Sequence, residues 1–288
     1  MAFDAPVHAP LPDLMVEPII RAALLEDLGR AGDITTEALV PADHRSRLVL
    51  AARQAGVAAG LDCARIAFGL LSPDVRFTRR VADGQAVAPG TVLAQVEGPS
   101  RALLTGERTG LNLACRLSGI ATATAGLVQA VAGHKAQIVC TRKTTPGLRA
   151  LEKYAVRAGG GANHRFGLDD AVLVKDNHVA IAGSVAEAVK RVRERAGHMV
   201  KIEVEVDTLA QLEELLPLGA DAVLLDNMSP PMLAEAVKMV GGRMLTEASG
   251  RVSRETAPAI AASGVDLISV GWLTHSAPIL DIGLDWAG

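Results

Sequence analysis

Five side chains that are cationic, or can become so, follow two short apolar runs of the chain or lie between them. Arg142 and Lys143 directly follow an apolar run, His164 and Arg165 repeat the pair further on, and Lys175 ends the next apolar run. Arginine suits carboxylates and phosphates because its planar guanidinium donates in parallel, and each charge-assisted hydrogen bond contributes about 1.5–3 kcal/mol. Because the whole chain has a formal net charge of −3, this local concentration predicts a site for a small polyanion.

Carboxylates follow the next three apolar runs in the same way. Glu203 or Glu205, Asp226 and Glu247 occupy these positions, and alternation along the first run puts Glu203, Glu205 and Asp207 on one face. The pattern favours structural roles for Glu203 and Asp207 and leaves Glu205 and Asp226 open. Carboxylates that face one another repel unless they hold a cation, and Mg²⁺ prefers such oxygen ligands. We therefore expect a Mg²⁺ that arrives with a phosphorylated substrate.

Small residues follow the last two apolar runs. Ser249, Gly250 and Gly271 would let backbone N–H groups approach a phosphate, which in a β/α barrel usually binds after the last strands. Together with the cationic and acidic groups, they indicate an enzyme that joins a small polyanion to a Mg-bound phosphorylated sugar or nucleotide.

These candidate residues all follow strand-like runs that alternate with amphipathic helical patterns after Gly133. Such alternation predicts parallel strands with right-handed helical crossovers, in an open doubly wound sheet or a barrel. Polar residues at every strand end favour the barrel, where catalytic groups come from the C-terminal ends of several strands. The region is much shorter than the roughly 250 residues of an eight-unit barrel, so we expect an incomplete parallel β/α barrel of about six to seven strands. The runs are "QIVCT", "AVLVK", "KIEVEV", "AVLLD", "RMLTE" and "LISVG".

The residues before the barrel pattern predict an N-terminal helix followed by a compact sheet-rich domain. Apolar spacing over residues 19–28 predicts a helix, and residues 47–98 contain short β-prone runs separated by turn signals. Residues 103–133 have helical spacing again, and Gly110 and Gly119 predict breaks into two or three helices.

The composition excludes several classes of protein. Aromatic residues make up only 2% of the chain and the net charge is negative, whereas nucleic-acid binding uses basic surfaces and stacking rings. The three cysteines form no Cys-x-x-Cys pair, which argues against a disulfide framework and a zinc site. The sequence shows no signal-peptide pattern and no run typical of a membrane span, so we expect a cytoplasmic protein that binds neither nucleic acid nor membrane.

Several motifs, taken together, resemble the quinolinate phosphoribosyltransferases, the decarboxylating nicotinate-nucleotide pyrophosphorylases of NAD biosynthesis. The resemblance covers nearly the whole chain, and the segment from Thr141 to Gly161 is highly specific. The motifs are "GERTGLNLACRLSGIAT", "TRKTTPGLRALEKYAVRAGGGANHRFGLDD", "KDNH", "EVEVDTLAQ", "LLDNM", "EASG" and "VGWLTHS".

The resemblance implies a sheet-containing N-terminal α/β sandwich domain over residues 1–111, to which residues 276–288 return, and an α/β barrel catalytic domain over residues 112–275. It also implies a homodimer with a shared active site, possibly a higher oligomer, in which each N-terminal domain covers the barrel of its partner. The implied substrates are quinolinate and 5-phosphoribosyl 1-pyrophosphate with Mg²⁺, and the products are nicotinate mononucleotide, pyrophosphate and CO₂.

The same resemblance implies roles for individual residues. Arg142, His164, Arg165 and Lys175 match residues that hold the two pyridine carboxylates, and Arg108 matches one donated across the dimer.

A second group matches the phosphoribosyl side of the family's site. Lys143 matches a residue beside the pyrophosphate, and Glu205 and Asp226 match residues at the ribose and the metal. The residues implied near the 5-phosphate are Ser249, Gly250 and Gly271, and the implied catalytic residues are Lys143, Lys175, Glu205 and Asp226.

Some features leave alternatives open. Arg251 and Trp272 stand where relatives often have smaller residues, which bears on phosphate binding, and a paralogous branch associated with molybdenum transport shares the fold. A Schiff-base aldolase would use Lys143 or Lys175 as the amine nucleophile. A non-enzymatic anion-binding protein is the third alternative, although it does not explain the three acidic strand ends.

Overall fold

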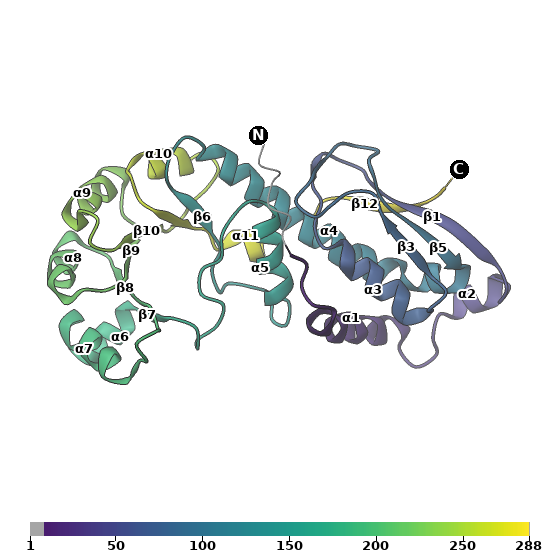
Figure 1. Ribbon diagram of the computed structural model, residues 1–288, viewed down its shortest axis with the longest axis horizontal. Coiled ribbons are helices and arrows are strands. Elements are labelled where there is room, and N and C mark those ends of the chain that lie inside the picture. Colours follow the sequence, from purple (N-terminus) through teal and green to yellow (C-terminus); the bar gives the residue numbers. More distant parts are fainter. Residues whose placement is uncertain (1–8, 288) are drawn as a thin grey trace. The chain divides into compact units, whose positions relative to one another are not determined.

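The computed structural model describes residues 9–287, and the chain forms two compact units (Figure 1). The first unit contains the residues up to 125, together with 144–160 and those from 273 onward. The second unit contains residues 126–143 and 161–272. The predicted boundary between residues 111 and 112 therefore falls inside the first unit, within a single long helix.

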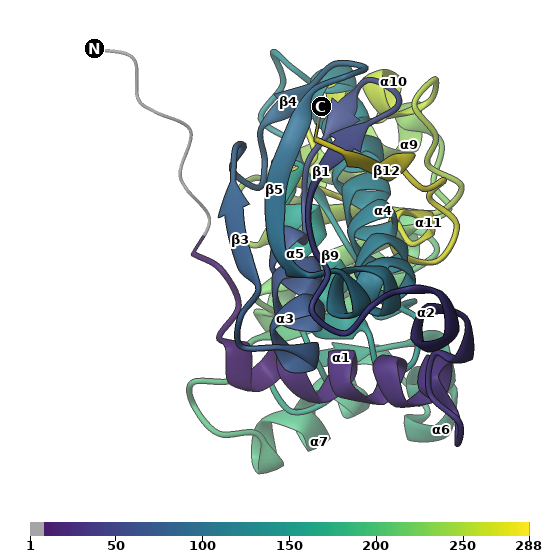
Figure 2. The ribbon, with the colours of Figure 1, turned by 90° about the vertical axis from the view of Figure 1, so that its right-hand side faces the viewer.

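The first unit is built on a four-stranded antiparallel sheet with strand order β12-β1-β5-β3 (Figure 2). The last strand, β12, pairs along β1, with Leu284 opposite Leu50. Buried Leu50 and Leu93 of the sheet share one core with Phe68 and Leu103 of the helices. The strands of this unit are β1 (Arg45–Ala52), β2 (Gly56–Val57), β3 (Arg76–Arg79), β4 (Ala86–Val87), β5 (Val92–Pro99) and β12 (Ile282–Trp286).

Helices cover one face of this sheet. Helix α1 ends where the sequence predicts, because Gly29 adopts a positive φ of 54° and its N–H bonds back to Leu25. One helix within the β-prone region was not predicted, namely α3, which buries Phe68 and its neighbours against the sheet. The helices that share a core with the sheet are α3 (Leu61–Leu71) and α4 (Ser100–Ala130), whose last turn belongs to the second unit. The other helices that lie wholly or mostly in the first unit are α1 (Asp13–Leu28), α2 (Ile34–Leu39), α5 (Arg149–Ala158) and the short α11 (Trp272–His275).

The prediction of two or three helices over residues 103–133 was wrong, because α4 is continuous. Gly110 and Gly119 do not break it and instead permit close packing. A Cβ at Gly110 would lie 3.2 Å from Ala64 Cα, and one at Gly119 would overlap the carbonyl oxygen of Pro278. By length and composition alone α4 could cross a membrane, but 56% of its most apolar window is buried inside the fold, as in the core helix of a soluble protein.

The second unit is the predicted parallel sheet of six strands, with order β6-β11-β10-β9-β8-β7. Each of the six apolar runs forms one strand, because each is short, rich in aliphatic residues and bounded by polar or glycine residues. The sheet curls into an incomplete barrel with β6 and β7 at its free edges (Figure 1). The strands are β6 (Gln137–Val139), β7 (Val172–Val174), β8 (Ile202–Val206), β9 (Ala222–Asp226), β10 (Leu245–Ser249) and β11 (Leu267–Ser269).

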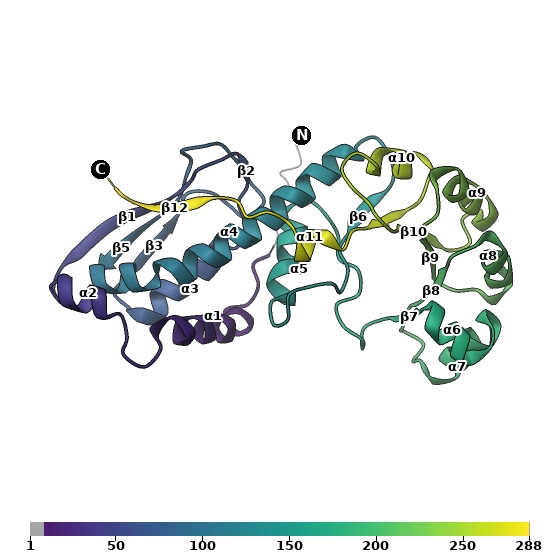
Figure 3. The ribbon, with the colours of Figure 1, turned by 180° about the vertical axis from the view of Figure 1, so that it is seen from behind.

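Amphipathic helices cover the outside of the incomplete barrel (Figure 3). The segment before β7 adds a parallel bridge from Ala162 to Val139, so it lies along the free edge of β6. His164 and Arg165 follow directly on this segment. The outer helices are α6 (Asp176–Ala182), α7 (Val185–Arg195), α8 (Leu209–Leu215), the 3₁₀ helix Leu216–Leu218, α9 (Pro230–Val240) and α10 (Ala257–Ala262).

Candidate active site

All six barrel strands run parallel, so the residues at or just after their C-terminal ends lie on the same edge of the sheet. This edge carries most of the predicted site. The residues that it brings together are Arg142 and Lys143 after β6, Lys175 after β7, Glu205 on β8, Asp226 on β9, Ser249 and Gly250 at the end of β10, and Gly271 after β11.

The cationic side of this edge contains two neighbouring arginines. Arg165 is partly buried, and its Nη1 donates to the carbonyl oxygen of Ala171 at 2.9 Å. Burial lowers the pKa of Arg165, and the positive charge of Arg142 lowers it further. The two positively charged guanidinium groups repel each other, and a bound anion would reduce this repulsion. The planar guanidinium donates two parallel hydrogen bonds, which suits a carboxylate.

Lys175 connects the cationic and acidic sides. Its Nζ lies 3.2 Å from Glu205 Oε2, and helix α6 begins at the next residue, so its backbone position is fixed. This contact places a cationic side chain between the arginines and the carboxylates of the strand ends.

The acidic side fits a divalent cation. Burial raises the pKa of Glu205, the Lys175 ammonium opposes the rise, and the negative charge of Asp226 on the adjacent strand adds to it. Two carboxylates that repel one another at the mouth of a barrel match the hard oxygen ligands that Mg²⁺ prefers. Glu205 and Asp226 are therefore the residues that could hold it.

One neighbour of this pair was missed by sequence reasoning. Asn227 adopts a positive φ of 53°, and its Nδ2 donates to Asp226 Oδ2 at 2.5 Å. Asparagine tolerates the left-handed region better than most residues, so the Asp-Asn pair at a strand end is the signal that could have revealed it.

The loop after β10 has the close packing expected of a phosphate site. Gly250 has a φ of 103°, and a Cβ there would overlap Asn227 Oδ1. Arg251 also has a positive φ, of 48°, and the Nε1 of Trp272 donates to the carbonyl oxygen of Val252 at 2.9 Å. The two unusual residues, Arg251 and Trp272, thus belong to this loop or tie it to the end of β11.

Gly271 lies against the side chain of Lys143. A Cβ at Gly271 would come within 2.9 Å of Lys143 Cδ and 3.7 Å of its Nζ. The absence of a side chain at this position therefore leaves room for the lysine at the strand ends.

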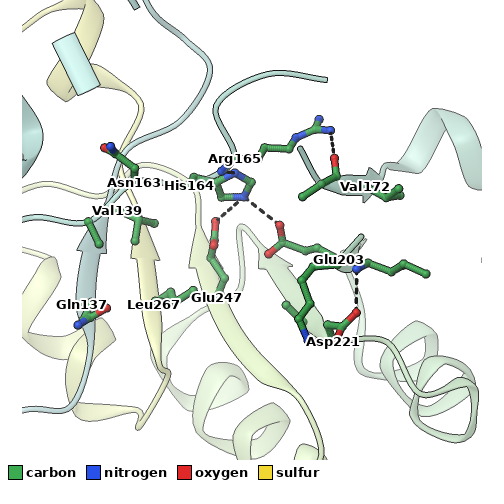
Figure 4. Close-up of a pocket in the computed structure, with 15 residues that line it drawn as sticks. Gln137, Val139, Asn163, His164, Arg165, Val172, Glu203, Asp221, Glu247 and Leu267 are labelled. Atoms are coloured by element: carbon green, nitrogen blue, oxygen red, sulfur yellow. Dashed lines mark hydrogen bonds and ion pairs between the residues drawn. The ribbon is translucent and has the colours of Figure 1, made fainter. Parts of the chain in front are cut away.

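His164 is turned into the barrel instead of toward the strand ends (Figure 4). Its Nε2 lies 2.9 Å from Glu203 Oε2 and 3.7 Å from Glu247 Oε1, and its Nδ1 accepts the N–H of Arg165 at 2.7 Å. A direct contact between His164 and a substrate carboxylate, which the resemblance implies, would require the ring to turn. These three side chains line a cavity of about 250 Å³ inside the barrel.

Glu247 is the most deeply buried member of this cluster. Burial raises its pKa to about 7, and the charge of Glu203 adds to the rise. Sequence reasoning placed Glu247 with the acidic strand ends, but it could not show that His164 lies beside it.

Arg108 lies in the first unit, on α4, and its side chain is 64% exposed. Its nearest ion-pair partner there is Glu107, at 3.6 Å. It borders a hollow lined by α1, α2 and α4 residues, among them Leu28 and Ile34.

Comparison with known proteins decides the family. The model for the N-terminal domain of quinolinate phosphoribosyl transferase matches residues 33–118, and the model for its C-terminal domain matches residues 120–285. The chain belongs to the quinolinate phosphoribosyltransferase family. The family predicted from the motifs is therefore confirmed.

Close relatives of this family span almost the same length. The chain is 49% identical over 273 residues to the nicotinate-nucleotide pyrophosphorylase [carboxylating] of Mycobacterium leprae, with 92% of this chain and 95% of that one covered. It is 44% identical over 272 residues to a probable enzyme of the same name from Bacillus subtilis, covering 94% and 93%.

The fold matches solved structures of the family equally well. NadC from Streptococcus pyogenes superposes with a TM-score of 0.93 at 39% identity, covering 97% of this chain and all of that one. The predicted fold, an incomplete parallel barrel with an N-terminal α/β domain, is thereby confirmed. The roles of the individual site residues stay predictions.

Proposed function

We propose that this protein transfers the phosphoribosyl group of 5-phosphoribosyl 1-pyrophosphate to quinolinate and decarboxylates the product to nicotinate mononucleotide. The observation that carries the proposal is the division of the strand ends into a cationic side around Arg142 and Arg165 and an acidic side around Glu205 and Asp226. The first suits the two carboxylates of quinolinate, and the second suits a ribose with a metal-bound pyrophosphate. Relatives that bear this activity in their names share 44–49% of the sequence.

The first contribution of these residues is binding and orientation. Arg142, Arg165 and Lys175 hold the two carboxylates, so that the pyridine nitrogen faces C1 of the ribose. The backbone around Ser249 and Gly250 holds the 5-phosphate, and Lys143 lies at the pyrophosphate. Fixing both reactants in this way turns a bimolecular reaction into an effectively unimolecular one, and such positioning is worth up to about 7–11 kcal/mol.

The second contribution is electrostatic. The pyridine nitrogen donates its lone pair to C1 as the C1–O bond to pyrophosphate breaks, and the sugar carries positive charge in between. The carboxylates of Glu205 and Asp226 stabilise that charge, and Lys143 stabilises the negative charge on the leaving pyrophosphate. As CO₂ leaves, the electron pair of the broken C–C bond stays on the ring carbon, where the adjacent positive pyridinium nitrogen stabilises it, and this carbon then takes a proton from solvent.

We propose Mg²⁺ as the metal that accompanies the pyrophosphate, with Glu205 and Asp226 as the protein ligands. When bound, the ion neutralises charge on the leaving group. Support for this assignment comes from the charges at the site: burial raises the pKa of Glu205, and the negative charge of Asp226 adds to the rise.

We further propose a cytoplasmic homodimer in which Arg108 completes the active site of the partner subunit. The exposure of Arg108 on α4 and the apolar, solvent-exposed side chains nearby, such as Ile34 and Leu104, are consistent with a covered face. Mixing separately inactive Arg108→Ala and Arg142→Ala proteins should restore part of the activity, because a mixed dimer contains one intact site. No recovery after demonstrated subunit exchange would count against the shared site.

The activity itself is tested with the purified protein, quinolinate, phosphoribosyl pyrophosphate and Mg²⁺, by following nicotinate mononucleotide. Nicotinate, which lacks one carboxylate, is the matched control acceptor, and chelation of the metal is the second control. Metal-dependent product from quinolinate alone supports the proposal. A folded protein that turns over neither acceptor would favour the paralogous branch associated with molybdenum transport.

A further inference from the structure

The hydrogen bonds around His164 determine which of its ring nitrogens carries the proton. The backbone N–H of Arg165 can only donate, and it lies 2.7 Å from His164 Nδ1, so Nδ1 must offer a lone pair. The ring proton therefore belongs on Nε2, which lies 2.9 Å from Glu203 Oε2. His164 is then a neutral imidazole that donates to Glu203 and accepts from Arg165.

This arrangement links Glu203 to the arginine of the proposed dicarboxylate site. The bond to Glu203 fixes the ring, and the ring in turn fixes the main chain at Arg165. From that fixed position the guanidinium donates from Nη1 to the carbonyl oxygen of Ala171 at 2.9 Å, and Figure 4 shows it extending away from the ring of His164. Glu203 and His164 are only 11% and 12% exposed in their side chains, so water does not compete freely for these contacts.

We propose that Glu203 is a positioning residue, which holds His164 as the Nε2-protonated tautomer and thereby fixes Arg165 for the substrate carboxylates. The inference rests on the proposed function, because that function makes Arg165 a ligand of the dicarboxylate. Glu203 itself touches no reacting atom and acts only through His164. A partner that selects a histidine tautomer in this way is a common device where a neighbouring group must be held in place.

The same cluster also resembles a metal site, since ligand atoms of His164, Glu203 and Glu247 lie within 4.8 Å of one another. The tautomer disfavours that alternative. A metal on Nε2 needs the lone pair of that nitrogen, and the ring proton would then have to sit on Nδ1, against the N–H of Arg165. Glu247 Oε1, which has no hydrogen-bond partner within residues 9–287, faces the Nε2–H from the other side at 3.7 Å.

The tautomer can be measured directly and without turnover. Protein labelled with ¹⁵N-histidine contains seven imidazoles, and the resonances that disappear in His164→Gln identify those of His164. We expect a protonated Nε2 and an unprotonated Nδ1 at neutral pH. A proton on Nδ1, or on both nitrogens, would overturn the proposal.

Kinetics of matched variants test the positioning role. Glu203→Met keeps the size of the side chain but cannot accept the Nε2–H, whereas Glu203→Gln still accepts through its amide oxygen. We expect Glu203→Met to raise the KM for quinolinate by about tenfold or more with little change in the KM for phosphoribosyl pyrophosphate, and Glu203→Gln to stay within about threefold of wild type. Glu235→Met, on the exposed face of α9, is the control for loss of a carboxylate.

The outcomes separate the inference from the proposed function. A wild-type protein without quinolinate turnover refutes the function, and the ¹⁵N spectrum still tests the tautomer. Equal losses in Glu203→Met and Glu203→Gln, or parallel rises in both KM values, would overturn the positioning role. Saturable binding of Zn²⁺ or Mn²⁺ that raises the Tm of the wild type but not that of Glu247→Gln would also overturn the positioning role. If Glu203→Met does not fold, Glu203→Gln and the wild-type spectrum carry the test.

Discussion

Replacing Arg165 by alanine should weaken quinolinate binding far more than it weakens the fold. The guanidinium would donate two charge-assisted hydrogen bonds to a substrate carboxylate, each worth about 1.5–3 kcal/mol. Arg142 remains nearby and water can enter, so we expect a net loss of about 2–4 kcal/mol, which is roughly 30- to 1,000-fold in kcat/KM for quinolinate.

The stability of the same variant should change little. Truncation removes the hydrogen bond to the carbonyl oxygen of Ala171, worth about 1 kcal/mol, but it also relieves the cost of burying the guanidinium and its repulsion from Arg142, which both lower the pKa of Arg165. The Tm should therefore stay close to that of the wild type, and Arg165→Lys, which keeps the charge but loses the fork, should have intermediate kinetics.

Initial rates at saturating phosphoribosyl pyrophosphate and Mg²⁺, with quinolinate varied, provide the assay. Arg195→Ala, at the exposed end of α7, is the matched control for loss of an arginine. Unchanged quinolinate kinetics in Arg165→Ala would refute the reasoning, and so would a loss confined to the KM for phosphoribosyl pyrophosphate.

Three further changes test other parts of the structure. Burial holds the pKa of Glu247 at about 7, above its ordinary 4.5, so this carboxyl stabilises the fold at low pH and that contribution is lost as the pH rises through 7. In denaturant titrations, the free energy of unfolding of the wild type should fall by up to about 3 kcal/mol between about pH 5 and pH 8, and this fall should be absent from Glu247→Gln. Identical pH profiles of the two proteins would contradict this. Gly250→Ala should lower the free energy of unfolding by about 1–3 kcal/mol and raise the KM for phosphoribosyl pyrophosphate, because a Cβ there overlaps Asn227. The control is Gly242→Ala, which also has a positive φ but lies in open space and therefore tests the backbone strain alone. Glu152→Gln removes the charge of a fully buried carboxylate that pairs with the partly exposed guanidinium of Arg116, and it should lower the free energy of unfolding by about 3–5 kcal/mol. A Tm equal to that of wild type would show that the pair is not needed.

The sequence predicted the barrel well because its strands carry strong local signals. Each of the six apolar runs is short and bounded by polar or glycine residues, and amphipathic helices separate them. Local sequence therefore sufficed to predict that the runs are strands and that the strands are parallel. The candidate residues at the strand ends followed from the parallel arrangement, because the C-terminal ends of all parallel strands lie on one edge of the sheet.

Elements that depend on packing were not predictable in the same way. Helix α3 follows short β-prone runs, and its helical state is stabilised by the burial of Phe68 against the sheet. Gly110 and Gly119 have the composition of helix breaks, but in α4 they allow close contacts with residues distant in the sequence, such as Ala64. Local propensity contains no information about such contacts.

The internal cluster at His164 shows the same limit within the site. The sequence identified His164 as a potential cation next to Arg165, and the resemblance implied a contact with substrate. Which way the ring turns depends on Glu203 and Glu247, which come from two different strands across the barrel. Only the three-dimensional arrangement reveals that both ring nitrogens contact protein atoms.

The most direct test of the central claim is the stoichiometry of CO₂ and pyrophosphate released from quinolinate by the wild-type protein. If the cationic strand ends hold a pyridine dicarboxylate beside a phosphoribosyl donor, the two products should appear one for one, and neither should appear at a comparable rate with nicotinate. Release of pyrophosphate without CO₂, or equal use of nicotinate, would contradict the account.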